Sequence, residues 1–159
     1  TIIEINVEEK TKEDTFTITI TDNGSGMTPE VLKSAVDPFF TSRTTRKVGL
    51  GLPLFKAAAE QTNGSFSIKS VPGKGTEVKA QFIRSSIDRA PLGNIAETMS
   101  TLIGGSPDID FIYTHNVDEK CFSFSTKDMR KILMDIPLDS PKITLWIADY
   151  INEGLAQLE

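Results

Sequence analysis

The chain has 159 residues with 17 basic and 22 acidic side chains, which gives a formal net charge of −5 at pH 7. This acidic balance argues against a broad surface for nucleic acid or anionic membrane, and no apolar run approaches the roughly 20 residues that span a bilayer. The length suits one domain, or one domain with an appendage, and the single cysteine, Cys121, excludes an internal disulfide and fits a cytoplasmic protein.

Four segments in the first half alternate apolar with polar residues, which is typical of strands with one buried and one solvated face. They centre on residues 3–7, 16–20, 66–68 and 78–82. Thr28, Pro29 and Glu30 form a helix start, with a hydroxyl cap, a proline in the first turn and an acid that favours the helix dipole. A second helix is predicted from near Leu50 to Gln61. This order predicts a helical layer over one face of a mixed sheet.

The second half has its own pattern. Helical spacing predicts a helix that ends at Gly104, residues 109–113 and 122–124 predict a hairpin, and Ser125 and Ser140 each precede a further helix. The last helix carries a broad apolar face that must be covered by the hairpin or by a partner chain; it consists of Ile143, Trp146, Ile147, Tyr150, Ile151, Leu155 and Leu158. We expect a small α+β appendage over residues 91–159, with residues 85–90 as its connector.

The most informative motif follows the second predicted strand and reads Asp22-Asn23-Gly24-Ser25-Gly26-Met27. A carboxylate at a strand end can accept a hydrogen bond from the exocyclic amine of a nucleotide base, and glycines let the backbone approach that base closely. The alternative is an ordinary turn, since Asp-Asn-Gly is also common turn chemistry. Considered alone, the motif favours the turn.

Three further boxes follow in order: Pro38-Phe39-Phe40, then Gly49-Leu50-Gly51, then Gly73-Lys74-Gly75-Thr76. Together with the Asp22 box they resemble the GHKL ATPase superfamily, which spans gyrase, Hsp90-type chaperones, histidine kinases and mismatch-repair proteins. The sequence P-F-F-T-S-R and the small number of residues between it and G-L-G-L are most similar to the histidine kinase branch. Over residues 1–84 the resemblance implies a Bergerat-type ATP-binding domain, a two-layer α/β sandwich of the α+β class.

The resemblance also implies roles for the residues of the boxes in an adenine pocket. Asp22 would accept a hydrogen bond from the adenine amino group, and Gly24 and Gly26 would shape the pocket floor. Met27 would pack on the base, and Thr76 would complete a polar or water-mediated network around it. Apart from the other boxes, Met27 would be interpreted as core packing and Thr76 as a hydroxyl at a strand start.

The phosphates are expected at the third box, because a helix that begins after Gly49 and Gly51 offers free backbone amides and the positive end of its dipole. The cations between the aromatic box and Gly49 predict a short ATP lid, although most charge runs are solvated loops. The residues expected to contact nucleotide in this region are Phe40, Thr41, Ser42, Arg43, Lys47, Val48, Gly49, Leu50, Gly51 and Leu52.

Other candidate residues carry weaker signals. His115 falls at a predicted hairpin end and is followed by Asn116, unlike the phosphoacceptor of histidine kinases, and strand alternation explains Asp108 and Asp110 better than a metal pair does. In GHKL proteins a helix before the first strand supplies the Asn that holds Mg²⁺ and often a catalytic acid. We therefore expect the Mg²⁺ ligand upstream of Thr1 and assign no catalytic or metal-binding residue in this chain.

The resulting hypothesis is a cytoplasmic signal-transduction protein with an ATP- and ADP-binding domain of the histidine kinase type. It would act as a kinase that phosphorylates a protein partner in trans, or as an ATPase. The alternative is a regulatory ATP-dependent binding module of the anti-sigma type, which the apolar face of the last helix would suit. The whole arrangement is similar to short stand-alone ATPase-domain proteins of anaerobic bacteria, and a protein partner is expected at the C-terminal region.

Overall fold

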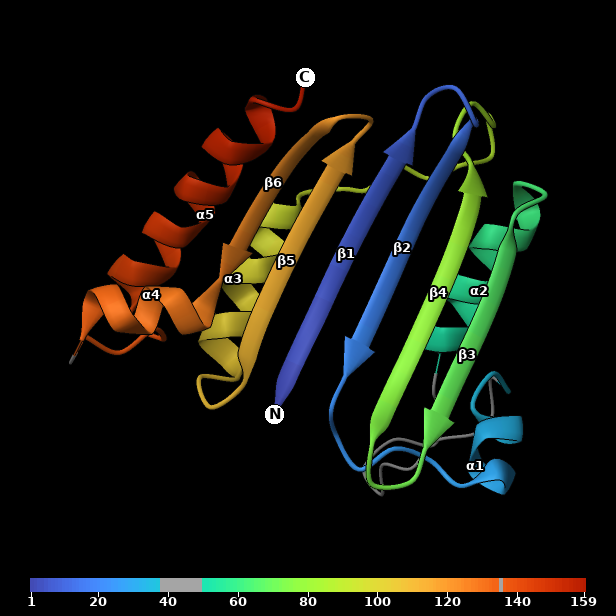
Figure 1. Cartoon of the computed structure of the whole chain (residues 1–159), viewed down its shortest axis with the longest axis horizontal. Coiled ribbons are helices and arrows are strands. Elements are labelled where there is room, and N and C mark those ends of the chain that lie inside the picture. Colours follow the sequence, from blue (N-terminus) through green and yellow to red (C-terminus); the bar gives the residue numbers. More distant parts are fainter. Residues whose placement is uncertain (38–49, 135) are drawn as a thin grey trace.

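The computed structural model describes residues 1–37, 50–134 and 136–159. In this part of the chain, six strands form one mixed sheet in the order β3-β4-β2-β1-β5-β6 (Figure 1). The strands are β1 (Ile2–Lys10), β2 (Thr15–Asp22), β3 (Ser65–Val71), β4 (Gly75–Ile83), β5 (Asp110–Val117) and β6 (Lys120–Ser125). The helices are α1 (Pro29–Ser34), α2 (Gly51–Gln61), α3 (Ile95–Gly105), α4 (Thr126–Leu133) and α5 (Pro141–Ala156). The expected α+β sandwich is confirmed.

Strand β1 lies inside the sheet and is paired along both edges. It runs antiparallel to β2, with Ile5 opposite Ile20, and parallel to β5, with Ile5 opposite Tyr113. The strands of the C-terminal stretch therefore extend the sheet of the N-terminal stretch, and the expected hairpin is the β5–β6 pair. A boundary at residue 91 between two folding units stays a prediction.

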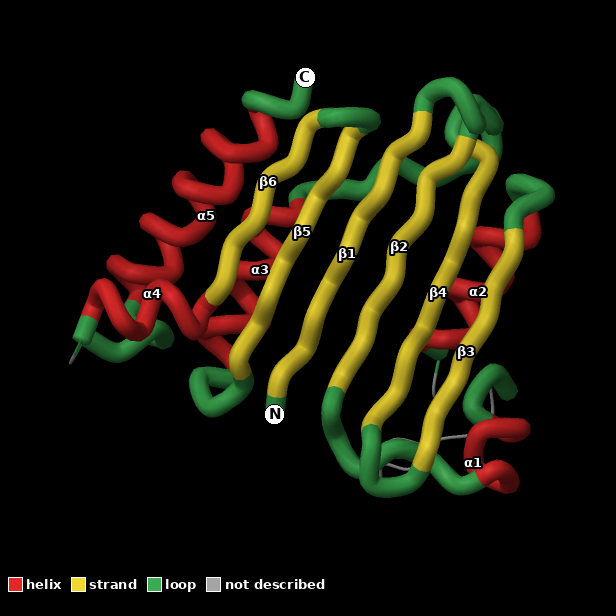
Figure 2. Tube along the Cα trace, in the orientation of Figure 1, coloured by secondary structure: helices red, strands yellow, loops and turns green. Residues whose placement is uncertain are grey.

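The two faces of the sheet differ in polarity, as the alternation predicts. Figure 2 shows α2 and α3 on the same side of the strands. On that side Phe55 of α2 packs against Phe66 and Phe82, with ring centroids 6.1 Å apart in each pair. The opposite face presents polar side chains such as Asn6 and Thr19, which are partners across the β1–β2 ladder. The apolar core thus lies between the sheet and the helices.

Helix α5 covers part of its apolar face with α3 and β6. Ile147 and Ile151 are fully buried, and the Ser100 hydroxyl on α3 donates to the Thr144 carbonyl on α5 at 2.9 Å. Gly154 lies directly against β6, because a Cβ there would sit 2.0 Å from the Phe122 ring. The sequence predicted the hairpin or a partner chain as the cover, and α3 is the additional element that provides it.

A buried hydroxyl joins the first residue of helix α4 to the sheet. The side chain of Thr126 is fully buried, and its Oγ1 accepts a hydrogen bond from the Phe111 backbone N–H at 2.8 Å and lies 3.4 Å from the Phe111 carbonyl oxygen. The residue therefore fixes the start of α4 against the start of β5.

Replacing Thr126 with valine keeps the shape of the side chain but removes its hydroxyl, so the buried Phe111 N–H loses a partner. The free energy of unfolding should fall by about 1–3 kcal/mol. The matched control is Thr98→Val on α3, where an exposed hydroxyl bonds the Asn94 carbonyl oxygen and the loss should stay within about 0.5 kcal/mol. Chemical denaturation of both variants measures the difference, and equal losses would contradict this role of Thr126.

Candidate functional site

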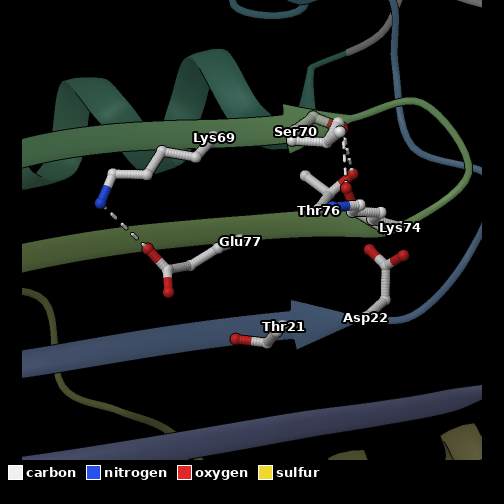
Figure 3. Close-up of a pocket in the computed structure, with 9 residues that line it drawn as sticks. Thr21, Asp22, Lys69, Ser70, Lys74, Thr76 and Glu77 are labelled. Carbon is white, nitrogen blue, oxygen red and sulfur yellow. Dashed lines mark hydrogen bonds and ion pairs between the residues drawn. The ribbon is translucent and has the colours of Figure 1, made fainter.

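A cavity of about 280 Å³ opens at the edge of the sheet where β2 and β3 end and β4 begins (Figure 3). Its position follows from the ladder, because Asp22 at the end of β2 is the partner of Thr76 at the start of β4. Side chains of paired residues on neighbouring strands lie on the same face. The cavity is lined by Thr21, Asp22, Lys69, Ser70, Val71, Lys74, Gly75, Thr76 and Glu77.

The Asp22 carboxylate is held by one of its two oxygens. Its Oδ1 accepts a hydrogen bond from the Gly24 N–H at 2.8 Å, and among the described residues Oδ2 has no hydrogen-bond partner. The next residue fixes the loop to the central strand, since the Asn23 Oδ1 accepts from the Ile2 N–H at 2.7 Å. The fold thus holds a carboxylate at the cavity with one oxygen available to a donor.

Two glycines make the close backbone approaches around the cavity possible. Gly26 has a φ of +65°, and a Cβ there would lie 2.1 Å from the Val71 carbonyl oxygen. Gly75 has a φ of +113°, and a Cβ there would lie 1.9 Å from the Asp22 carbonyl oxygen. Both positions need a residue without a side chain, for conformation and for space.

Ser70 was not among the candidates from the sequence, although it lies at the centre of the site. Its Oγ accepts a hydrogen bond from the Met27 N–H at 2.8 Å, and lies 3.0 Å from the Gly75 carbonyl oxygen and 2.9 Å from Thr76 Oγ1. The signal that could have found it is the alternation of β3, which puts a hydroxyl at the inward position after Phe66 and Ile68.

The cations at the cavity come from β3 and the β3–β4 turn. Lys69 forms an exposed ion pair with Glu77 at 3.6 Å across the two strands (Figure 3). Such an exposed pair contributes little to stability. Lys74 is exposed beside the cavity, so a positive side chain is available to an anionic ligand there.

Helix α1 starts directly after the Asp22 loop. The Thr28 hydroxyl oxygen caps it by accepting from the Val31 N–H at 3.4 Å. Hydrogen bonds from its own backbone N–H and from Thr28 hold the pKa of the Glu30 carboxyl below its usual value. This agrees with the predicted helix start.

The predicted site residues fall into three groups. Asp22, Gly24 and Thr76 come together at the cavity, Gly26 packs against its wall at Val71, and Met27 joins them through its bond to Ser70. At the third box α2 begins at Gly51, after an exposed Leu50, with Leu52 half-buried, and none of these three is among the residues that line the cavity. The remainder lie outside the described residues: Phe40, Thr41, Ser42, Arg43, Lys47, Val48 and Gly49.

His115 lies at the opposite end of the sheet and is buried. Its Nδ1 is 2.9 Å from the Tyr113 hydroxyl and its Nε2 is 3.1 Å from Glu9 Oε1, while Arg84 bonds the other Glu9 oxygen at 3.3 Å. Burial, and secondarily the Glu9 charge, raises the pKa of the Tyr113 phenol. These contacts give His115 a structural role within the core.

Within the described residues, neither a metal-binding cluster nor a membrane-spanning helix adds to the site. Asp110 pairs with Arg130 at 3.2 Å, and among the described residues no group of three or more His, Cys, Asp or Glu side chains is arranged to hold a metal ion. In residues 1–37, 50–134 and 136–159, no helix is both long and apolar enough to cross a membrane.

The comparison with protein families assigns the fold and the boxes to one class. The model of the histidine kinase-, DNA gyrase B- and HSP90-like ATPases matches residues 1–86, more than half of the chain. The chain belongs to this family and contains an ATP-binding domain of the histidine kinase-like type. The resemblance stated from the four boxes is confirmed.

Similar curated proteins include sensor histidine kinases, such as ZraS and YxdK, and a sensor protein, SrrB. ZraS of Salmonella typhimurium is 39% identical over 72 residues, which cover 45% of this chain and 15% of that protein. YxdK of Bacillus subtilis is 32% identical over 75 residues (45% and 23%), and SrrB of Staphylococcus aureus is 40% identical over 79 residues (46% and 13%). The matched stretch is therefore under a quarter of the length of each of these relatives.

Among solved structures, the histidine kinase domain of the E. coli osmosensor EnvZ is 26% identical to this chain. The match covers 55% of each chain, with a TM-score of 0.34.

Replacing Gly26 with alanine should lower the free energy of unfolding by about 2–4 kcal/mol. The new methyl group would clash with the Val71 carbonyl, and the alanine would have to adopt a left-handed backbone conformation. Gly73→Ala is the matched control. Gly73 has a similar φ of +76° with nothing within 4 Å of an added Cβ, so about 1 kcal/mol should be lost. Urea unfolding followed by the fluorescence of Trp146 measures both values. If Gly26→Ala loses no more stability than Gly73→Ala, the close approach of Gly26 to the Val71 carbonyl is wrong.

Proposed function

We propose that the protein binds ATP and ADP at the cavity between the end of β2 and the start of β4, with the adenine amino group donating to Oδ2 of Asp22. The observation that carries this proposal is the Asp22 carboxylate, which is fixed through Oδ1 by the Gly24 amide and offers Oδ2 to a donor. Met27, whose backbone N–H donates to Ser70 at the cavity, would form an apolar wall and Thr76 a polar one, which is the composition of a base pocket. The family match supports the choice of an adenine nucleotide.

The triphosphate would extend from the cavity to the start of α2. This helix has no side-chain cap at Leu50 and no acidic residue in its first turn, so its backbone amides and dipole favour an anion. Gly51 leaves the first turn open, with nothing within 4 Å of an added Cβ. Lys74 and the cations of residues 41–47 would supply further charge.

The activity we infer is phosphorylation of a protein partner in trans, within a signalling system. The support for it is the family match of residues 1–86 together with the similarity of 72 and 75 residues to two sensor histidine kinases, which are kinases by name. In such a reaction the described residues bind the nucleotide and orient it, and none of them is assigned to the transfer step.

The second candidate is a regulatory module that binds its partner in response to ATP, without catalysis. The observation that favours it is the exposed apolar surface of α5, where Leu145 is 68%, Trp146 44% and Tyr150 38% exposed. ATP labelled in its γ-phosphate separates the two candidates. A kinase transfers the label to its partner, whereas a regulatory module forms a nucleotide-dependent complex and leaves the label on ATP.

Changing Asp22 to Asn should weaken ATP and ADP binding by about 1–3 kcal/mol, because the substitution allows an amide donor to face the donor of the base. Asp149→Asn on the exposed side of α5 removes the same charge far from the cavity and should leave the affinity unchanged. Calorimetric titration of the three proteins measures these differences. Equal affinities for wild type and Asp22→Asn would contradict the assignment of Asp22.

Mg²⁺ is expected to accompany ATP, and among the described residues no group of three or more His, Cys, Asp or Glu side chains is arranged to hold a metal ion. We infer that its ligand is an Asn on a helix upstream of Thr1. The side chains of Ile3, Ile5 and Ile18 are only half-buried on the helical side of the sheet, and a helix there would cover them. When bound, the ion would neutralise phosphate charge during transfer.

A protein that includes this upstream helix should bind ATP about tenfold more tightly with Mg²⁺ than without it. The chain that begins at Thr1 should show no such dependence and should neither hydrolyse ATP nor transfer its phosphate. Parallel binding and turnover assays on the two proteins test this. Turnover by the shorter chain at the rate of the longer one would mean that the metal ligand and catalytic groups lie within these 159 residues.

A further inference from the structure

Ser70 is a residue at which three parts of the cavity wall meet. It is half-buried on β3, and its hydroxyl lies within 3.0 Å of a backbone donor of the Asp22 loop, a backbone acceptor of the β3–β4 turn and the hydroxyl of Thr76 on β4. We propose that Ser70 is a specificity-determining positioning residue. It orients the Thr76 hydroxyl so that the wall beside Asp22 offers only acceptors, and thereby selects a base with an exocyclic amino group.

The hydrogen-bonding capacity of one hydroxyl leads to this assignment. A serine hydroxyl has one proton to donate and two lone pairs to accept with. The Met27 N–H can only donate, so it occupies one lone pair at 2.8 Å, and the Gly75 carbonyl can only accept, so it takes the Ser70 proton at 3.0 Å. The Thr76 hydroxyl, 2.9 Å away, must then donate to the second lone pair. This arrangement satisfies all three contacts at once.

The consequence lies on the side of Thr76 that faces the cavity. With its proton directed to Ser70, Thr76 Oγ1 presents lone pairs only. Its partner across the ladder is Asp22, whose Oδ2 is also an acceptor. Two neighbouring acceptors suit an amino group, which carries two N–H donors, and repel a carbonyl oxygen at the same position.

This inference rests on the proposed nucleotide site and concerns its choice between 6-amino and 6-oxo purines. Replacing Ser70 with alanine frees the Thr76 proton to turn toward the base. The Thr76 hydroxyl could then donate to a 6-oxo group, so the discrimination should fall. Lys74, which also lines the cavity, is the same in every variant, so its attraction for either nucleotide cancels when the variants are compared.

The experiment measures the dissociation constants of ATP and ITP by calorimetry, for the wild type and for the variants Ser70→Ala, Ser70→Thr and Ser67→Ala. Ser70→Ala should lower the ratio of ITP to ATP dissociation constants about tenfold, the equivalent of one hydrogen bond. Ser70→Thr keeps the hydroxyl and should retain the ratio. Ser67 is an exposed serine on the same strand, three residues away, and its replacement should change nothing.

A purely structural role for Ser70 would weaken both nucleotides equally and leave the ratio unchanged, which would overturn the inference. If Ser70→Ala does not fold, Thr76→Val gives the second test, because it removes the acceptor and leaves the Ser70–Met27 bond in place. An unchanged ratio in Thr76→Val would also overturn the inference. A wild type that binds ATP and ITP equally contradicts only this inference, whereas a wild type that binds neither contradicts the proposed function.

Discussion

The burial of one face of the sheet is the constraint on which the rest of this structure depends. Each strand alternates apolar with polar residues, and a single register places Val7, Phe16 and Phe82 on the same side. A shift by one residue would turn a strand's apolar side chains to solvent. The helices therefore pack on that side. The same register places Asp22, at the end of β2, beside Thr76, near the start of β4.

The cavity at this edge is stabilised from two directions. Asn23 connects the Asp22 loop to the start of β1, and Ser70 connects the same loop to the β3–β4 hairpin. The backbone N–H of Gly73 adds a third connection by donating to the Ser25 carbonyl oxygen at 2.7 Å. A loop with several such anchors is preorganised, so less conformational freedom is lost when a ligand binds.

Local patterns in the sequence were sufficient for the elements and for the family. Alternation located β1 to β6, the Thr28-Pro29 pair located the start of α1, and the four boxes identified the ATPase family. These signals are local, because each depends on residues close together in the chain. They were correct because local propensity and the final fold agree in these segments.

The features that the sequence did not provide depend on non-local contacts. The alternation of β1 is the same whichever strand lies beside it, so its pairing with β5 could not be read from it. Ser70 occupies an ordinary inward position of a strand, and its importance comes from the distant residue Met27. Likewise, an apolar face such as that of α5 requires a cover without specifying α3 as the cover.

The pairing of β1 with β5 also has a consequence for the order in which the chain can fold during its synthesis. About a hundred residues separate Ile5 from its partner Tyr113, and a ribosome adds roughly 5–20 residues per second. For several seconds one edge of β1 therefore presents unpaired backbone donors and acceptors, to which another nascent chain could add. This strand carries three glutamates, Glu4, Glu8 and Glu9, against one lysine, Lys10. Its net negative charge disfavours pairing with an identical nascent chain while β5 is still absent.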